Sequence, residues 1–241
     1  MKLVIVRHGE PDYSIDSLTE RGFMEAELLS KRIYDLKPDE VYVSPLGRAR
    51  DTAAPSLKLL GKEEIILPWL REFPARIIKP WKNEPGCCWD WLPEVWTKRE
   101  AFYDKDRWFD CKEMNQDDLK NIYEDVISSF DLFMAEHGYV REDNIYKAVK
   151  PNRDTIVLFC HFALECVLLS RLIGASPMVL WHGFCAAPTS VTTVYSEERR
   201  KGIASFRISS FGDVSHLYAN GVEPSFAARF CETFDSDERH D

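Results

Sequence analysis

The chain has 241 residues, and its 45% hydrophobic content is enough for one large α/β core. Its formal net charge of −9 disfavours nucleic acid and anionic membranes as partners, because both attract a basic face. No segment reaches the roughly 18 apolar residues of a membrane span, and the first residues lead into an apolar strand rather than a signal peptide, so we expect a cytoplasmic protein. The seven cysteines include no CxxC pair, which indicates neither a disulfide framework nor a common structural zinc site.

The first 73 residues alternate between strand and helix patterns. Residues 3–6 form an unbroken apolar run, which is typical of a strand buried on both faces of a parallel sheet. Ser44-Pro45 indicates a helix start, because Ser caps free N–H groups and Pro fits the first helical position. The predicted elements here are strands at 3–6, 40–43 and 65–67 and helices at about 23–36 and 45–60. This order is the α/β pattern.

Residues 74 to about 116 break the regular pattern. They contain five of the seven tryptophans: Trp81, Trp89, Trp91, Trp96 and Trp108. An irregular stretch of this length is usually functional or disordered, and its aromatic content argues against disorder. We therefore predict an ordered lid, held together at least in part by an aromatic cluster of its own.

Regular elements resume after this insert. Apolar residues between 117 and 137 recur with helical spacing, and an apolar strand at 155–160 leads directly to His161. The remaining predicted elements are a helix at 163–173 and strands at 189–195 and 203–209. The acidic tail after Phe234 is expected to fray.

Polar motifs follow several of the predicted strands. Arg7-His8-Gly9-Glu10 follows the first strand, Ser44-Pro45-Leu46-Gly47-Arg48-Ala49 follows the second, and His161 follows the strand at 155–160. Open α/β sheets bind their ligands just outside the carboxyl ends of the strands. We therefore expect these loops to meet at one site.

These motifs resemble those of the histidine phosphatase superfamily. Thr52, and Leu70-Arg71-Glu72 after the third strand, belong to the same pattern. The resemblance covers the whole chain, and the motifs occur in the same order. The resemblance implies one domain, residues 1–241, with the lid inserted at about 74–116. It also implies a three-layer α/β/α sandwich with a mostly parallel central sheet. The implied chemistry is phosphoryl transfer through a phosphohistidine, without a metal or other cofactor.

The residue types support this chemistry independently. A phosphomonoester dianion repels a nucleophile, so a site without metal must gather cations and N–H donors around the phosphoryl oxygens, as Arg7, Arg48 and His161 can do. Arg48 lies in the first turn of a predicted helix, whose N-terminus attracts anions, and its guanidinium matches phosphate geometry. His8 is the candidate nucleophile, because a neutral imidazole carries a lone pair near pH 7.

The leaving alkoxide needs a proton from an acid. Some members of the family carry an Asp directly after the second histidine, but this chain has Phe162 there. We therefore select Glu72 as the proton donor. Glu10 and Glu165 remain alternatives.

Two departures from the family concern the substrate pocket. Most members have Gly where this chain has Phe162, so an aromatic ring is expected at the pocket wall, and we count it among the substrate-binding residues. The mutase branch has Asn six residues after the nucleophile, where Ser14 stands here, and a longer loop than residues 10–18. We therefore favour a hydrolase and treat Ser14 as a second substrate-binding candidate.

The predicted function is a metal-independent phosphomonoesterase of the histidine acid phosphatase type, acting on a small phosphorylated metabolite. Two alternatives are a phosphoglycerate-type mutase and a catalytically silent protein that binds a phosphorylated ligand or a protein partner. A metal site at Cys87, Cys88 and Cys111 is a further alternative, disfavoured because adjacent cysteines are poor zinc ligands. The substrate's identity and the oligomeric state stay open.

Overall fold

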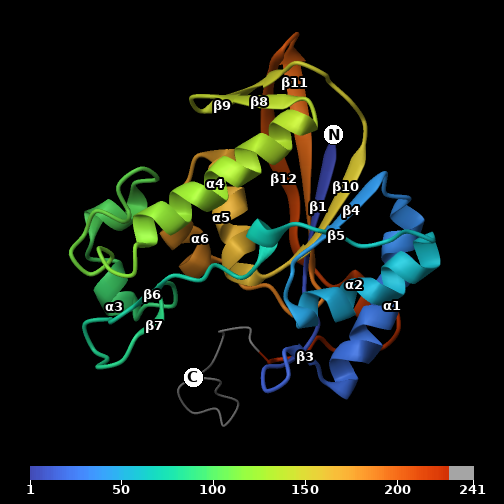
Figure 1. Ribbon diagram of the computed structural model, residues 1–241, viewed down its shortest axis with the longest axis horizontal. Helices are drawn as coiled ribbons and strands as arrows, with labels where there is room; N and C mark the ends of the chain where they lie inside the picture. The colour runs from blue at the N-terminus through green and yellow to red at the C-terminus, as the bar shows by residue number, and fades with distance from the viewer. Residues whose placement is uncertain (228–241) are drawn as a thin grey trace.

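The computed structural model describes residues 1–227 and is built around an eight-stranded sheet (Figure 1). The strands are β1 (Lys2–Arg7), β4 (Glu40–Val43), β5 (Ile65–Ile66), β8 (Tyr139–Glu142), β9 (Ile145–Ala148), β10 (Thr155–Cys160), β11 (Val191–Arg200) and β12 (Ile203–Asp213). Their order across the sheet is β5-β4-β10-β1-β11-β12-β9-β8. Pairing is parallel from β5 to β1 and antiparallel from β1 to β8.

Helices cover both faces of this sheet (Figure 1). The longer ones are α1 (Glu20–Leu36), α2 (Gly47–Leu60), α4 (Leu119–Glu136), α5 (Phe162–Ile173) and α6 (Pro177–Gly183). Short helical segments are α3 (Pro93–Trp96), α7 (Ser215–Tyr218) and the 3₁₀ turns η1 (Pro68–Leu70) and η2 (Glu100–Tyr103). Among residues 1–227, no helix combines the length and apolar character that a membrane span requires.

The side chains of β1 show why three layers form. Successive strand residues point to opposite faces of the sheet. Val4 and Val6 pack in one core, with Leu29 of α1 and with α2. Leu3 and Ile5 pack in the other core, with α4, α5 and α6. A strand that is apolar at every position therefore needs a cover on both sides. The predicted α/β fold class, with a central sheet between helices, is confirmed.

Several predicted boundaries differ from the observed ones. The predicted strand at 65–67 is only two residues long, and Ile65 and Ile66 are exposed at the sheet edge. The strand predicted to begin at Thr189 begins at Val191, because Thr189 has a left-handed backbone with φ 57°. The antiparallel β8–β9 pair was not predicted. The predicted fraying after Phe234 concerns residues outside the described range.

The insert at 74–116 packs onto the main body. It contains a small hairpin of β6 (Arg76–Ile77) and β7 (Gly86–Cys87), followed by α3 and η2. Its rings contact one another, as in the T-shaped Trp91–Phe102 pair, and Trp108 packs edge-on against Trp181 of α6 with centroids 5.3 Å apart. The predicted aromatic cluster is therefore present, and it is continuous with the core beneath it.

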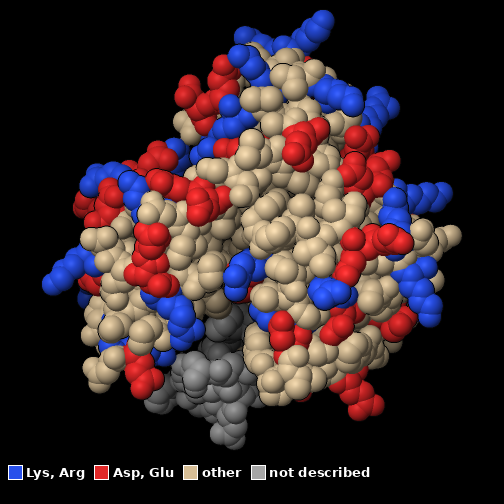
Figure 2. All heavy atoms as spheres, viewed as in Figure 1, with Lys and Arg blue, Asp and Glu red and all other residues tan. Residues whose placement is uncertain are grey.

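A recess separates two lobes of the molecule. In Figure 2 it lies between the lobe formed by α3, β6 and β7 and the lobe formed by α1, α2 and the small β2–β3 hairpin (Pro11–Asp12 and Ser17–Leu18). Acidic and basic side chains are interspersed on this face. The carboxyl ends of β1, β10 and β4 lie side by side in register, since Arg7 pairs with Cys160, and Phe159 with Val43.

Candidate active site

His8 follows β1 directly and is buried. Its Nδ1 lies 2.7 Å from the carbonyl oxygen of Gly9, and a carbonyl only accepts hydrogen bonds, so Nδ1 carries the proton. Burial, followed by the charges of Arg7 and Arg48, places the pKa of His8 well below its usual value. His8 is therefore a neutral imidazole with its lone pair on Nε2, the form that a nucleophile requires.

Backbone hydrogen bonds fix the loop that carries His8. The His8 N–H donates to the Cys160 carbonyl at 3.1 Å, and the Thr189 N–H donates to the His8 carbonyl at 3.1 Å. The Gly9 N–H donates to Oγ1 of Thr52 at 2.9 Å. Thr189 has a left-handed φ of 57°, which is rare for a β-branched residue and costs of order 1–3 kcal/mol of backbone strain. This strained residue is hydrogen-bonded to the backbone of the candidate nucleophile.

His161 lies between β10 and α5, as the N-cap residue of α5, and faces His8. The two ring centroids are 5.2 Å apart. Its Nε2 lies 2.7 Å from Oγ of Ser44, and its Nδ1 is buried without a hydrogen-bond partner among residues 1–227. Burial, followed by the proximity of His8 and the positive charge of Arg48, holds the pKa of His161 well below its usual value.

Arg7 is the last residue of β1, and only 3% of its surface is exposed. Its Nη1 donates to the carbonyl of Ala186, and its guanidinium lies 5.7 Å from the ring centroid of Phe162. Its Nε has no hydrogen-bond partner in the described part of the chain. Burial lowers the pKa of Arg7 from its ordinary value, which is so high that the side chain stays cationic at neutral pH.

Arg48 is the second residue of α2. Its Nη1 contacts Oδ1 of Asp16 at 2.5 Å, while Oδ2 of the same carboxylate accepts from the Gly47 N–H at 2.8 Å. The expectation that Ser44 caps this helix at its first turn is wrong. Ser44 lies too early for that role, since α2 begins at Gly47; its hydroxyl instead contacts His161 and accepts weakly from Leu46 N–H at 3.3 Å.

Glu72 lies after η1 and is half-buried. Its Oε1 accepts from the N–H groups of Phe73 at 2.9 Å and Leu164 at 3.1 Å. Burial raises the pKa of Glu72, although these two hydrogen bonds and the charges of Arg48 and Arg7 oppose the shift. A carboxyl group with a raised pKa is suited to donate a proton near neutral pH.

The two predicted substrate-binding residues have different surroundings. Ser14 is exposed, and its hydroxyl donates to Oδ1 of Asp12 at 2.5 Å, so the structure gives it no contact with the histidines. Phe162 is buried between Arg7 and the insert, with its centroid 6.5 Å from that of Trp89. Phe162 thus forms part of the wall of the cluster, whereas the role of Ser14 stays a prediction.

The two alternative acids are placed differently from Glu72. Glu10 is already engaged: it accepts from Oγ1 of Thr19 at 2.8 Å and from the hydroxyl of Ser225. Glu165 is 1% exposed in α5, and burial raises its pKa to about 7 although a hydrogen bond from Thr192 opposes the shift. Glu10 is partly exposed, but its carboxylate is occupied by these two hydroxyl groups, and Glu165 lacks the exposure that a proton donor to a substrate needs.

Three residues that contact the cluster of His8, His161, Arg7 and Arg48 were not predicted as site residues. Ser44 contacts His161, Asp16 holds Arg48, and the Tyr13 ring lies 5.4 Å from the Arg48 guanidinium carbon. The position of Ser44 directly after β4 is a signal that was available, because the ends of parallel strands converge. No sequence signal indicated the contacts of Asp16 or Tyr13, which depend on how the 11–18 hairpin folds back.

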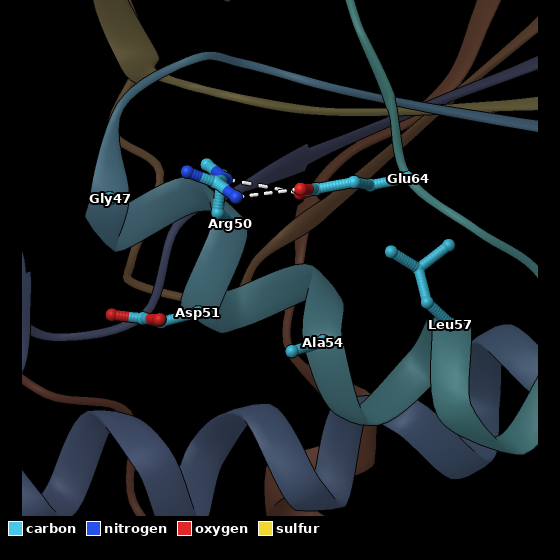
Figure 3. Close-up of a pocket in the computed structure, with 6 residues that line it drawn as sticks. All are labelled: Gly47, Arg50, Asp51, Ala54, Leu57 and Glu64. Atoms are coloured by element: carbon cyan, nitrogen blue, oxygen red, sulfur yellow. Dashed lines mark hydrogen bonds and ion pairs between the residues drawn. The ribbon is translucent and has the colours of Figure 1, made fainter.

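A surface hollow lies on the outer side of α2 (Figure 3). It is lined by Gly47, Arg50, Asp51, Ala54, Leu57 and Glu64. The guanidinium of Arg50 is paired with both Glu64 carboxylate oxygens, at 3.0 and 2.6 Å. This cation is neutralised and is separate from the histidine cluster, so it offers a control position for tests of Arg48.

The cysteines of the insert, Cys87, Cys88 and Cys111, are free thiols, and burial raises the pKa of each. Within residues 1–227, no group of three or more His, Cys, Asp or Glu side chains is arranged to hold a metal ion.

Comparisons with known proteins agree with this geometry. Residues 3–100 match the model of the histidine phosphatase superfamily, branch 1. The chain is 35% identical over 75 residues to a probable phosphatase of Schizosaccharomyces pombe, covering 27% of this chain and 36% of that protein. It is 32% identical over 88 residues to a probable phosphoglycerate mutase of Photorhabdus laumondii, covering 33% and 41%. The alignments thus span about two fifths of these relatives or less.

The fold likeness extends further than the sequence likeness. A phosphoserine phosphatase from Entamoeba histolytica, solved as a histidine-to-alanine variant in complex with phosphoserine, superimposes with a TM-score of 0.59 at 20% identity, covering 90% of this chain and 98% of that one. These findings confirm the predicted resemblance: residues 3–100 have the sequence pattern of branch 1 of the histidine phosphatase superfamily, and the chain shares its fold with this phosphoserine phosphatase.

Proposed function

We propose that this protein is a phosphomonoester hydrolase that acts through a phosphohistidine on a small phosphorylated metabolite. One observation carries the proposal. Around the neutral His8, three buried nitrogens have no hydrogen-bond partner among residues 1–227: Nε of Arg7, Nε of Arg48 and Nδ1 of His161. Unsatisfied buried donors are costly, and an anion with several oxygens would satisfy them together. A phosphoryl group is such an anion.

The proposed reaction has two steps. The His8 Nε2 attacks phosphorus, an N–P bond forms, the ester P–O bond breaks, and the Glu72 carboxyl gives its proton to the departing alkoxide. The Glu72 carboxylate then takes a proton from a water molecule that attacks phosphorus, the N–P bond breaks, and inorganic phosphate leaves. Arg7, Arg48 and His161 stabilise the charge on the phosphoryl oxygens in both steps.

We also propose that the chain is one domain in which the insert at 74–116 covers the site and sets substrate choice. Two contacts support this placement: Trp89 packs edge-on against Phe162, and Phe162 lies against Arg7. The organic part of an ester bound between Arg7 and Glu72 would therefore meet the aromatic side chains of the insert.

A screen of phosphomonoesters, each assayed for free phosphate and for isomerised ester, tests the function. A hydrolase releases phosphate, a mutase yields the isomerised ester, and a silent binding protein gives neither. We expect phosphate release that EDTA leaves unchanged and that orthovanadate inhibits competitively. Strict dependence on an added divalent ion would contradict the proposed chemistry.

A further inference from the structure

The hairpin after the candidate nucleophile is docked firmly on α2. Its strands pair Pro11 with Leu18 and Asp12 with Ser17, and Oγ of Ser17 donates to Asp51 of α2 at 2.5 Å. At the end of the tip, Asp16 adopts φ 49°, and its carboxylate holds both the first N–H of α2 and the Arg48 guanidinium. The tip, residues 13–16, is therefore fixed beside the proposed phosphate site.

Tyr13 stands at this tip in an unusual setting. Its ring is 64% exposed, yet it lies over Arg48, with 5.4 Å between the ring centroid and the guanidinium carbon. Desolvation raises the pKa of Tyr13, the positive charges of Arg7 and Arg48 oppose this shift, and the charge of Glu72 adds to it.

We propose that Tyr13 is a substrate-contacting residue whose hydroxyl donates a hydrogen bond to the phosphoryl group bound by Arg7 and Arg48. This rests on the proposed function, because it assigns one more contact to the same site. A phenol at neutral pH keeps its proton and donates without adding charge. Its ring covers the exposed side of Arg48 and shields that cation from water, which strengthens the pairing of Arg48 with an anion.

Three variants separate the parts of this role. Tyr13→Phe removes the hydroxyl and keeps the ring over Arg48, whereas Tyr13→Ala removes both. Ile15→Ala is the matched control, because Ile15 is 69% exposed on the same tip. The affinity for inorganic phosphate and for orthovanadate is measured by calorimetry, which needs no turnover, and kcat/KM is measured on the best ester from the screen.

We expect Tyr13→Phe to weaken phosphate binding and to lower kcat/KM by about 10-fold each, as for the loss of one hydrogen bond to a charged group. Tyr13→Ala should lose more, and Ile15→Ala should match the wild type. Unchanged phosphate affinity in Tyr13→Phe would overturn the inference while leaving the proposed function standing. A wild-type protein that binds phosphate without hydrolysing any ester would refute the proposed function and leave the Tyr13 contact measurable.

Discussion

The rings of His8 and His161 face each other with centroids 5.2 Å apart and planes tilted by 54°. The pKa values of both histidines lie well below the usual value for histidine. Burial is the main cause, and neighbouring positive charge, including that of Arg48, adds to it. Two neutral imidazoles beside a guanidinium can divide the work: one offers a lone pair, and the other offers an N–H to the phosphoryl oxygens.

Glu72→Gln should remove the proton donor without changing the size of the side chain. We expect kcat for an alkyl phosphate to fall about 100-fold, within the usual contribution of a general acid. The loss should be less than about 10-fold for p-nitrophenyl phosphate, whose leaving group departs without a proton. In the wild type, the alkyl phosphate rate should fall as pH rises through the raised pKa of Glu72, and the variant should lack this limb. Equal losses on both esters would assign Glu72 a structural role instead.

Arg48→Ala should raise KM and lower kcat together, because this cation is proposed to hold phosphate in the ground state and in the transition state. The expected loss in kcat/KM is about 100-fold, which corresponds to about 3 kcal/mol. Arg50→Ala on the same helix is the control, since Arg50 is paired with Glu64. If both variants lose activity alike, the effect comes from a weakened α2 and not from phosphate binding.

Glu165→Gln should change how stability depends on pH. The folded-state pKa of Glu165 is about 7, above its ordinary value of 4.5. Below pH 4.5 the carboxyl is protonated in both the folded and the unfolded chain. Between pH 4.5 and 7 the carboxyl is ionised only in the unfolded chain, so the free energy of unfolding decreases as pH rises.

The full loss for Glu165, reached above pH 7, is about 3 kcal/mol, since the two pKa values differ by about 2.5 pH units. Urea denaturation at pH 5 and pH 8 measures it. Because part of the loss has already occurred at pH 5, the decrease in unfolding free energy between these pH values should be smaller in the Gln variant by about 2.5 kcal/mol. Identical decreases would show that Glu165 is ionised in the folded protein.

The insert is tested by Trp89→Ala, because Trp89 contacts Phe162 beside the site. Replacement of the whole insert would remove Trp108 from the core and unfold the protein, so a point variant is cleaner. We expect kcat/KM to fall about 10-fold for a bulky ester and to stay unchanged for p-nitrophenyl phosphate. Trp96→Ala is the control, since Trp96 stacks instead on His182 of α6 with centroids 4.8 Å apart. An unchanged preference between esters in Trp89→Ala would mean that the insert does not select substrates.

The sequence predicted most of the strands around the site because their apolar runs are unambiguous. Val4 and Val6 need a cover on one face and Leu3 and Ile5 on the other, and this requirement specifies three layers. The convergence of the loops then follows from parallel pairing, which places His8 and His161 at the same edge.

Features that depend on long-range contacts were not predictable. Asp16 caps α2 from 31 residues away, so the local Ser44-Pro45 signal gave the wrong capping residue. The left-handed backbone of Thr189 shortens β11, but the residue type favours a strand. The β8–β9 pair is short and half-exposed, and it is stabilised by pairing with β12 rather than by a strong pattern of its own.

The most direct test of the account is to trap the intermediate on His8. Wild-type protein quenched during turnover of a ³²P-labelled ester should carry acid-labile phosphate on a peptide that contains His8. His8→Ala should carry none and should release no phosphate, while folding as the wild type does by circular dichroism. Labelled phosphate on another residue, or phosphate release that persists in His8→Ala, would contradict the proposed mechanism.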